Sequence, residues 1–133
     1  ELIPPGSKNF VSEENLFNYQ AKIIKMLADK ESCVIIGRCA DFVLKDRPNV
    51  LKVYVHAPFE NCVKTTMEIR NLDQAEAEKF ERKVDKRRGD YYRYFTGRDW
   101  KDADNYDLCL DSATLGWEKC MQIVKAYLEI KMS

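Results

Sequence analysis

The sequence predicts an α/β protein whose parallel sheet carries helices on both faces. Three short apolar runs have the composition of buried strands, and they are Cys33–Gly37, Leu51–His56 and Tyr106–Leu110. Segments whose apolar residues recur at helical spacing separate these runs. Strands that alternate with helices form βαβ units, in which the strands are parallel. The 133 residues are enough for one domain with a single core.

The composition is that of a globular protein with balanced charge. Apolar residues make up 45% of the chain, and 22 Lys and Arg residues balance 22 Asp and Glu residues. A net charge of zero does not favour duplex nucleic acid as a partner, but it leaves room for a local arginine site that binds a small anion. We expect no secretory leader and no membrane-spanning segment, because no apolar run has the necessary length.

The cysteines favour a reduced, cytoplasmic protein. Their number is odd, no C-x-x-C pair occurs and their spacings match no zinc pattern; they are Cys33, Cys39, Cys62, Cys109 and Cys120. We expect free thiols that pack as small hydrophobic residues where they fall in a strand or on the apolar face of a helix. The sequence therefore predicts no metal site.

The first helix has a clear start. An extended lead-in is expected over residues 1–11, because it contains two prolines followed by glycine and serine. Ser12 can cap the helix that follows, and Val11 can pack on Leu16 in its first turns. Helical spacing of apolar residues continues to about Lys30.

Later helices are also marked by their end signals. Pro58 suits the first position of a helix that runs to about Arg70. Asp73 and Glu76 have the spacing of a capping box, which opens a long helix over Gln74–Phe95. Two more helices are expected, a short one near Ala40–Leu44 and a last one from about Thr114, whose apolar face carries Trp117, Cys120, Met121, Val124, Tyr127 and Leu128.

Gly37 and Arg38 come at the end of the first predicted strand. Ligand sites in open parallel sheets lie at the carboxyl ends of strands. The planar guanidinium of arginine can bind a phosphate through two hydrogen bonds at once. Position alone leaves two interpretations of Arg38 open, an anion-binding residue or a solvated loop residue.

The long helix over Gln74–Phe95 carries a second group of cations. Its apolar stripe comprises Ala77, Phe80, Val84, Tyr91 and Phe95. Arg87 and Arg88 stand where this stripe should continue, and a guanidinium at a core-facing position needs a partner such as an anion, worth about 1.5–3 kcal/mol. We therefore expect Arg87 and Arg88 to bind an anion, whereas Lys83 and Lys86 are expected to form ion pairs on a surface helix.

Aromatic residues gather in the sequence next to these arginines, namely Tyr91, Tyr92, Tyr94, Phe95 and Trp100. Such rings can stack a nucleobase, but they more often pack in a core, and packing is the favoured interpretation. A binder of single-stranded nucleic acid that uses them is disfavoured by the zero net charge. A structural role is also expected for His56, the only histidine, because nothing pairs it with a nucleophile.

Three motifs in this order resemble the cytidylate kinase-like family, whose members are P-loop proteins similar to nucleoside monophosphate kinases. They are IIGRCAD at residues 35–41, VDKRR at residues 84–88 with YYRYFTG at residues 91–97, and NYDL at residues 105–108. The resemblance covers about residues 12–130. It implies a P-loop kinase-like three-layer sandwich and transfer of the γ-phosphoryl group of ATP, with Mg²⁺, to a nucleoside monophosphate such as CMP.

The resemblance also implies an acceptor site. Arg38 matches the family arginine that contacts the phosphate-accepting nucleotide. Asp41 is a weaker match, because cytidylate kinases carry an aspartate directly after that arginine and Cys39 stands there in this chain.

Residues 73–100 resemble the family's lid, a helix and loop whose arginines close over the phosphates. Arg87 and Arg88 match the arginines that act on the transferring phosphate, and Arg93 is a further substrate contact. Phosphoryl transfer depends on positioning and on neutralising negative charge, which these side chains can supply.

The N-terminal third of the family pattern has no counterpart in this sequence. Its five glycines form no G-x-x-x-x-G-K-[ST] motif, so the family's first strand and Walker A loop are missing from the sequence. We expect residues 12–133 to form a partial cytidylate kinase-like domain, with the central strand supplied by an N-terminal segment or by a second chain. This chain alone is expected to be inactive, and poorly stable or self-associating.

A second departure lies on the helix after Pro58. Cys62 and Thr65 stand where relatives often carry arginines. This difference keeps an alternative open, a non-catalytic member of the fold that binds nucleotide, phosphate or a partner protein.

Overall fold

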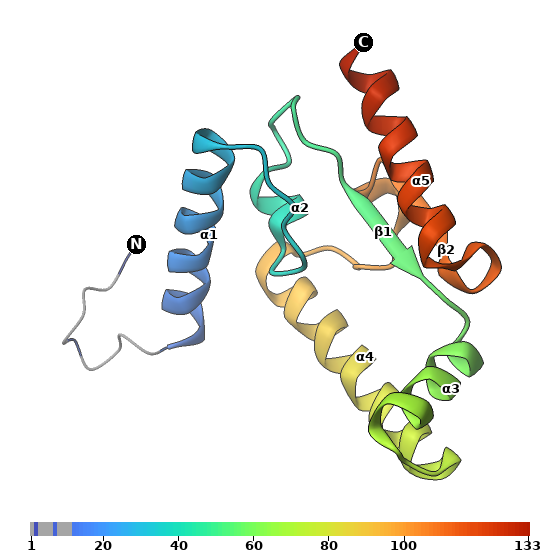
Figure 1. The fold of residues 1–133 in the computed structure, drawn as a ribbon. Helices are drawn as coiled ribbons and strands as arrows, with labels where there is room; N and C mark the ends of the chain where they lie inside the picture. Colours follow the sequence, from blue (N-terminus) through green and yellow to red (C-terminus); the bar gives the residue numbers. More distant parts are fainter. Residues whose placement is uncertain (1, 3–6, 8–11) are drawn as a thin grey trace. The chain divides into compact units, whose positions relative to one another are not determined.

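The computed structural model describes residues 2, 7 and 12–133 and divides the chain into two compact units, Glu1–Val50 and Leu51–Ser133 (Figure 1). We refer to them as unit 1 and unit 2. Most of the predicted lead-in over residues 1–11, including the packing of Val11 on Leu16, lies outside the described residues. None of the described helices combines the length and the apolarity needed to cross a membrane.

Unit 1 is built on helix α1, Glu13–Lys30, and the short helix α2, Ala40–Val43. The hydroxyl of Ser12 accepts a hydrogen bond from the backbone N–H of Asn15, which confirms the predicted N-cap. The core of the unit joins the two helices through the buried side chains Ile24, Ala40 and Leu44, against which Ala28, Ile35, Val43 and Val50 pack.

The strand predicted at Cys33–Gly37 is not formed. Residues 32–36 are irregular, and no backbone hydrogen bond joins them to another part of the described chain. Ile35 packs on the core of unit 1, whereas Val34 and Ile36 are 91% and 88% exposed. The in-and-out alternation is that of a strand, but a strand needs a partner for its backbone groups, and the described residues provide none.

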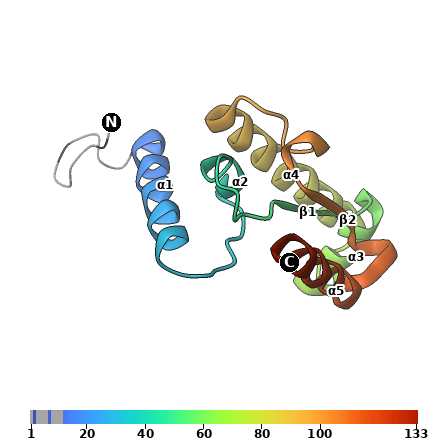
Figure 2. The ribbon, with the colours of Figure 1, turned by 90° about the horizontal axis from the view of Figure 1, so that it is seen from above.

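Unit 2 contains a two-stranded parallel sheet. Strand β1, Val53–His56, pairs with β2, Leu108–Asp111, in a register that sets Val53 beside Leu108 and His56 beside Asp111 (Figure 2). Both strands were predicted from the sequence, each starting two residues earlier. The parallel sheet with helices between its strands confirms an α/β arrangement on a small scale.

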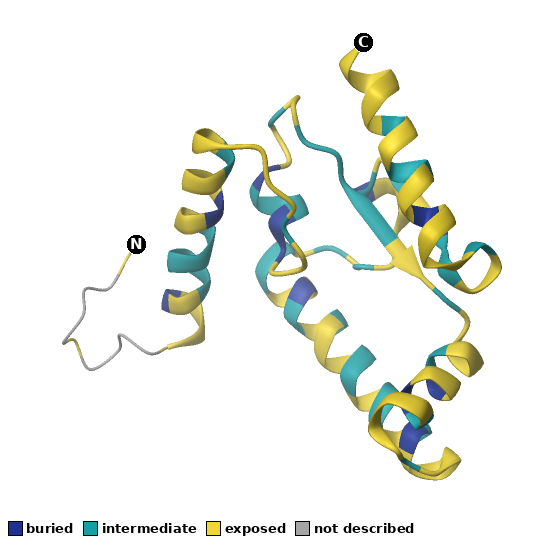
Figure 3. Ribbon diagram, in the orientation of Figure 1, coloured by how far each residue is buried: buried dark blue, intermediate teal, exposed yellow. Residues whose placement is uncertain are grey.

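Helices α3, Phe59–Arg70, and α4, Gln74–Thr96, pack against each other in unit 2. Pro58 is the N-cap of α3, and Asp73 and Glu76 form the predicted capping box at the start of α4. The hydroxyl of Thr66 on α3 donates a hydrogen bond of 2.5 Å to Glu81 Oε1 on α4. The buried residues of this pair are Val63, Thr66, Ala77 and Tyr92, and Figure 3 shows dark blue both where the helices meet and towards the far end of α4.

The last helix, α5, spans Ser112–Met132 and lies against both strands. Asp111 caps it by accepting hydrogen bonds from the backbone N–H groups of Ala113 and Thr114. Gly116 interrupts the helix with φ 79° and ψ 163°, so the regular part begins at Trp117. The predicted apolar face is divided, because Cys120 is buried whereas Trp117, Met121 and Leu128 are exposed.

Candidate functional site

Arg38 stands in an unusual backbone turn of unit 1. Gly37, Arg38 and Cys39 have successive φ values of 70°, 58° and 57°, all in the left-handed region. Glycine adopts this conformation freely, but for each residue with a side chain it costs about 1–2 kcal/mol of conformational free energy. The turn closes through a hydrogen bond of 3.1 Å from Ala40 N–H to Gly37 O, and the Arg38 side chain is exposed. Backbone strain of this kind is found more often at functional sites than elsewhere.

Cys39 and Asp41 follow Arg38 at the start of α2. The Cys39 side chain is buried, and burial, followed by the charge of Asp41, raises the pKa of its thiol to about 11. Cys39 is therefore a neutral packing residue, as expected for a buried cysteine. Asp41 is half-buried in the first turn of the helix. The structure thus keeps Arg38 and Asp41 three residues apart on one short segment, with Arg38 the more accessible of the two.

The structure corrects the interpretation of Arg87 and Arg88 as core-facing residues, because both are exposed on α4. The inward side of the helix continues instead through Gly89 and the buried Tyr92. A Cβ atom placed on Gly89 would lie 3.0 Å from Nε1 of Trp100, so the helix approaches this ring closely at that point. Arg87 and Arg88 therefore lie beside the contact between Gly89 and Trp100 and take no part in it.

Cations on α4 fall into two groups. Arg82 pairs with Glu78 at 4.0 Å and Lys86 pairs with Asp90 at 2.5 Å, each between residues four positions apart. The pair of Lys86 confirms its expected role, whereas the ion pair expected for Lys83 does not occur among the described residues. Arg87, Arg88 and Arg93 form no ion pair with any side chain of the part of the chain that the structure describes. All three are exposed, so their charges are available to a ligand.

Arg88 belongs to a group of side chains where α3 meets α4. Burial, and then the charges of Glu81 and Asp85, raise the pKa of the Cys62 thiol, whereas the charge of Arg88 lowers it. The four residues are therefore electrostatic neighbours: one cation, two carboxylates and a thiol. Thr65 is exposed on α3, away from the buried contact of Thr66.

Sequence reasoning missed the two carboxylates of this group. Glu81 and Asp85 are four residues apart on the side of α4 that faces α3, and both are half-buried. The available signal was their spacing, because acidic residues at i and i+4 share one helix face with the apolar Ala77. The apolar stripe instead predicts that Arg87 and Arg88 occupy the core-facing side of the helix.

Aromatic side chains of unit 2 form two separate groups. Tyr54 on β1 stacks on Tyr106 and His56, at centroid distances of 5.0 Å and 5.4 Å, and meets Trp100 edge-on at 5.4 Å. Tyr106 Oη donates a hydrogen bond of 2.6 Å to the backbone oxygen of Trp100. Burial is the main cause that raises the pKa of Tyr54, followed by the charge of Asp85. His56 and Trp100 thus contribute to packing, as the sequence favoured.

The second aromatic group lies near the end of α4. Phe95 makes edge-on contacts of 4.8 Å with Tyr91 and with Tyr94, and Tyr94 is largely exposed. The single cluster predicted from the sequence is therefore divided, because Trp100 turns to Tyr54 and Tyr106.

The predicted site residues are distributed over both units. Arg38 and Asp41 belong to unit 1, whereas Arg87, Arg88 and Arg93 share α4 in unit 2. Among residues 2, 7 and 12–133, no three side chains of His, Cys, Asp or Glu gather in a way that could hold a metal ion.

Comparison with known proteins identifies the family. A sequence model described as the cytidylate kinase-like family matches residues 4–114, which is most of the chain. The chain belongs to the cytidylate kinase-like family. It is 26% identical over 107 residues to a cytidylate kinase of Methanosarcina barkeri (strain Fusaro / DSM 804), a match that covers 79% of this chain and 59% of that protein. The family resemblance drawn from the three motifs is thus confirmed.

A solved structure has the same fold as this cytidylate kinase-like chain. It is the crystal structure of an uncharacterised protein from Eubacterium ventriosum ATCC 27560, with a TM-score of 0.74 and 29% sequence identity. The similarity covers 90% of this chain and 68% of that one. The chain therefore spans about 59% of the length of the curated relative and about two thirds of the structural one.

Proposed function

We propose that this cytidylate kinase-like chain takes part in transfer of the γ-phosphoryl group of ATP to a nucleoside monophosphate, with CMP as the first acceptor to test. The name of the Methanosarcina barkeri relative supports the choice of CMP. Arg38, presented by its left-handed turn, binds the acceptor phosphate, and Asp41 contributes to the same subsite. Arg87 and Arg88 bind the transferring phosphate, with Arg93 as a further substrate contact.

The observation that carries this proposal is the group of three exposed arginines on α4. Arg82 and Lys86 form ion pairs within the helix, whereas Arg87, Arg88 and Arg93 form none among the described residues, although Glu81 and Asp85 lie near Arg88. Three exposed guanidinium groups within two turns repel one another, and a phosphate removes that repulsion while accepting their hydrogen bonds. Since phosphoryl transfer spreads negative charge over the moving group, the same contacts favour the reaction.

The binding sites for ATP and for Mg²⁺ in the proposed reaction are not complete in this chain. The sequence contains no Walker A motif, so the cradle for the ATP phosphates comes from another segment or chain. Mg²⁺, which would bridge the ATP phosphates, is held largely by phosphate oxygens in such sites, and no residue of this chain is assigned to it. In this proposal, the present residues supply the acceptor and lid side of the site.

We also propose that a central strand, which the described sheet lacks, is added by another segment or chain. Residues 32–36 keep the alternation of a strand but have unpaired backbone groups, and β1 has one edge that does not pair within the described sheet. Because residues 32–36 are largely exposed, water can satisfy their backbone groups, and the support for an added strand is the alternation of this segment together with the unpaired edge of β1 within the described sheet. A P-loop three-layer sandwich is the architecture that such a strand completes.

The alternative is a non-catalytic member that binds nucleotide or phosphate without transferring it. The neutral Cys62 beside Arg88 favours this alternative, because the α3 side of the group adds no positive charge for a transferring phosphate. Phosphoryl transfer from ATP to CMP, measured with a form of the protein that includes a Walker A segment, separates the two. Turnover supports the kinase, whereas tight CMP binding without turnover supports the binder.

The test of the binding site compares two arginines of one helix. Arg88→Ala should weaken the binding of inorganic phosphate, the probe for the transferring phosphate, roughly tenfold or more, as expected for the loss of a charge-assisted hydrogen bond. Arg82→Ala is the matched control, since Arg82 pairs with Glu78 and lies over the ring of Phe59. Titration calorimetry and the melting temperature are measured for both variants. An unchanged dissociation constant for Arg88→Ala would contradict the assignment of Arg88 as a phosphate-binding residue.

A further inference from the structure

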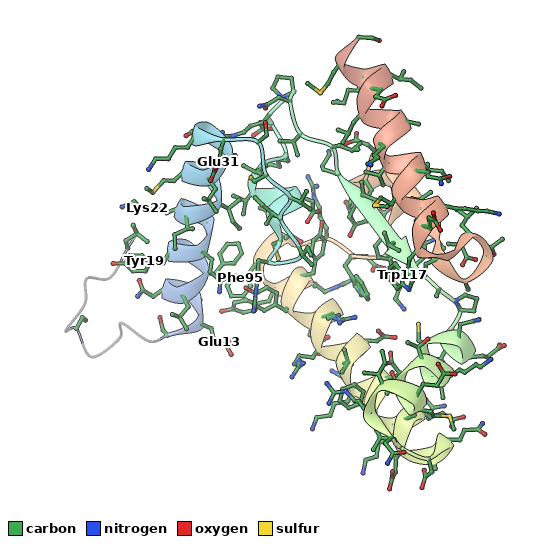
Figure 4. The ribbon with its side chains drawn as sticks, in the orientation of Figure 1. Glu13, Tyr19, Lys22, Glu31, Phe95 and Trp117 are labelled. Carbon is green, nitrogen blue, oxygen red and sulfur yellow. The ribbon has the colours of Figure 1, made fainter. Side chains whose placement is uncertain are left out.

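Helix α5 carries an apolar stripe that the structure leaves in solvent. Trp117, Met121, Leu128 and Met132 are 76%, 55%, 38% and 83% exposed, and the half-buried Val124 lies between them. We call these five residues the α5 stripe. The side of the helix next to the stripe is already occupied, because Cys120 is buried and α5 lies against β1 and β2. Figure 4 labels Trp117, which opens the stripe.

The spacing of the stripe is that of a helix–helix seam. Successive residues from Trp117 to Leu128 are four, three and four positions apart, the alternation that keeps side chains facing a second helix. The break at Gly116 lets the regular helix begin at Trp117 itself. Large apolar side chains left exposed in a row along a helix are typical of an interaction site.

Charges beside the stripe indicate the occupant. Glu118 and Lys125 lie on the same side of the stripe, seven residues apart, and neither forms an ion pair within the described chain. If a second α5 runs antiparallel with its Leu128 across from Trp117, its Lys125 comes beside Glu118. The twofold symmetry of such a pair repeats this contact, so one sequence supplies both halves of the complementarity.

We propose that two copies of this chain associate through the α5 stripe, with their α5 helices antiparallel. The association buries Trp117 against Leu128 of the second copy and Met121 against Val124 of the second copy. Glu118 and Lys125 close one side of the seam through two equivalent ion pairs. This inference does not depend on the proposed phosphoryl transfer.

The first experiment measures the mass of the 133-residue chain in solution by sedimentation over a wide range of concentration. We expect a reversible dimer. Leu128→Glu should raise its dissociation constant roughly tenfold or more, because each copy loses a buried leucine contact. Ile130→Glu is the matched control: Ile130 is 75% exposed on the same helix but lies on another face, so its dimer should persist.

A second measurement follows Trp117 directly. Trp117 and Trp100 are the two tryptophans of the chain, and only Trp117 should become buried on association. Its emission should shift to the blue as the concentration rises in the wild type and in Ile130→Glu, but not in Leu128→Glu. Glu118→Lys should weaken the dimer, and Glu118→Lys combined with Lys125→Glu should restore it.

Three results would overturn the proposal. The first is a chain that stays monomeric at every concentration. The second is equal weakening by Leu128→Glu and Ile130→Glu, which would indicate non-specific association. The third is a dimer in which the exchanged charges fail to restore what Glu118→Lys removes, because the helices would then not be antiparallel in this register.

Discussion

Arg38 combines an exposed guanidinium with a backbone conformation that side chains disfavour. Its φ of 58° lies between those of Gly37 and Cys39, and its side chain is in solvent. Nothing in the packing of unit 1 depends on the guanidinium, so stability alone gives no reason for a residue other than glycine there. The acceptor phosphate that we propose for Arg38 would supply that reason.

Replacing Arg38 therefore should change stability and binding in opposite directions. Arg38→Gly should raise the free energy of unfolding by about 0.5–1 kcal/mol, because relief of the left-handed strain exceeds the entropy that glycine adds to the unfolded chain. The same change should weaken CMP binding. Arg38→Ala, which keeps the strain and loses the guanidinium, should weaken binding without the gain. Chemical denaturation measures the stability, and a loss of stability in Arg38→Gly would contradict the account.

The raised pKa of Cys39 predicts an order of thiol reactivity. With a pKa of about 11, roughly one Cys39 in a thousand is a thiolate at pH 8, and its side chain is only 4% exposed. Cys33 and Cys109 were expected to pack as small hydrophobic residues in strands, but both are exposed, so they should be alkylated first. Mass spectrometry after brief alkylation gives the order. Labelling of Cys39 should rise in urea or as the pH approaches 11, and its early modification at pH 8 would contradict the packed turn.

Individual residues were predicted unevenly. The exposed position of Arg38 and the packing roles of His56 and Trp100 followed from the sequence. The orientation of Arg87 and Arg88 did not. A stripe of only a few apolar residues leaves the direction of the buried helix face too uncertain to decide which neighbouring positions point inward. The core-facing path runs through Gly89, which leaves no apolar signal in the sequence.

The helices were predicted nearly to their ends, and so were two of the three strands. Ser12, Asp73 and Glu76 each make the capping hydrogen bonds that their residue types indicated. These signals are local, so they hold whatever the rest of the chain does. The strand at Cys33–Gly37 failed because its pattern states only that the segment suits a sheet, and the pairing partner is not among the described residues.

The contact between α3 and α4 provides a test at the level of elements. Thr66 is buried and donates its hydroxyl hydrogen to Glu81, which lies in the group around Arg88. Thr66→Val keeps the shape but leaves the carboxylate without this donor, and should cost about 1–2 kcal/mol of stability. Thr66→Ser keeps the hydroxyl and should cost less. Thermal unfolding compares the two, and a valine variant as stable as the wild type would show that the hydrogen bond contributes nothing.

At the scale of the molecule, the family and the α/β class followed from the sequence, but the extent of the sheet did not. The sequence predicts three strands between Cys33 and Leu110. In the structure the sheet comprises β1 and β2, and unit 1 keeps a small core around Ile24, Ala40 and Leu44. Pairing between distant segments decides which strands form, and a one-dimensional pattern does not contain it.

The central proposal is that this chain recognises the phosphate of a nucleoside monophosphate through Arg38. The most direct test compares the binding of CMP and of cytidine, which differ only in the phosphate, by the wild type and by Arg38→Ala. We expect the wild type to bind CMP roughly a hundredfold more tightly than cytidine, as two charge-assisted hydrogen bonds from one guanidinium imply, and Arg38→Ala to lose most of this preference. Equal affinity of the wild type for CMP and cytidine would contradict the claim.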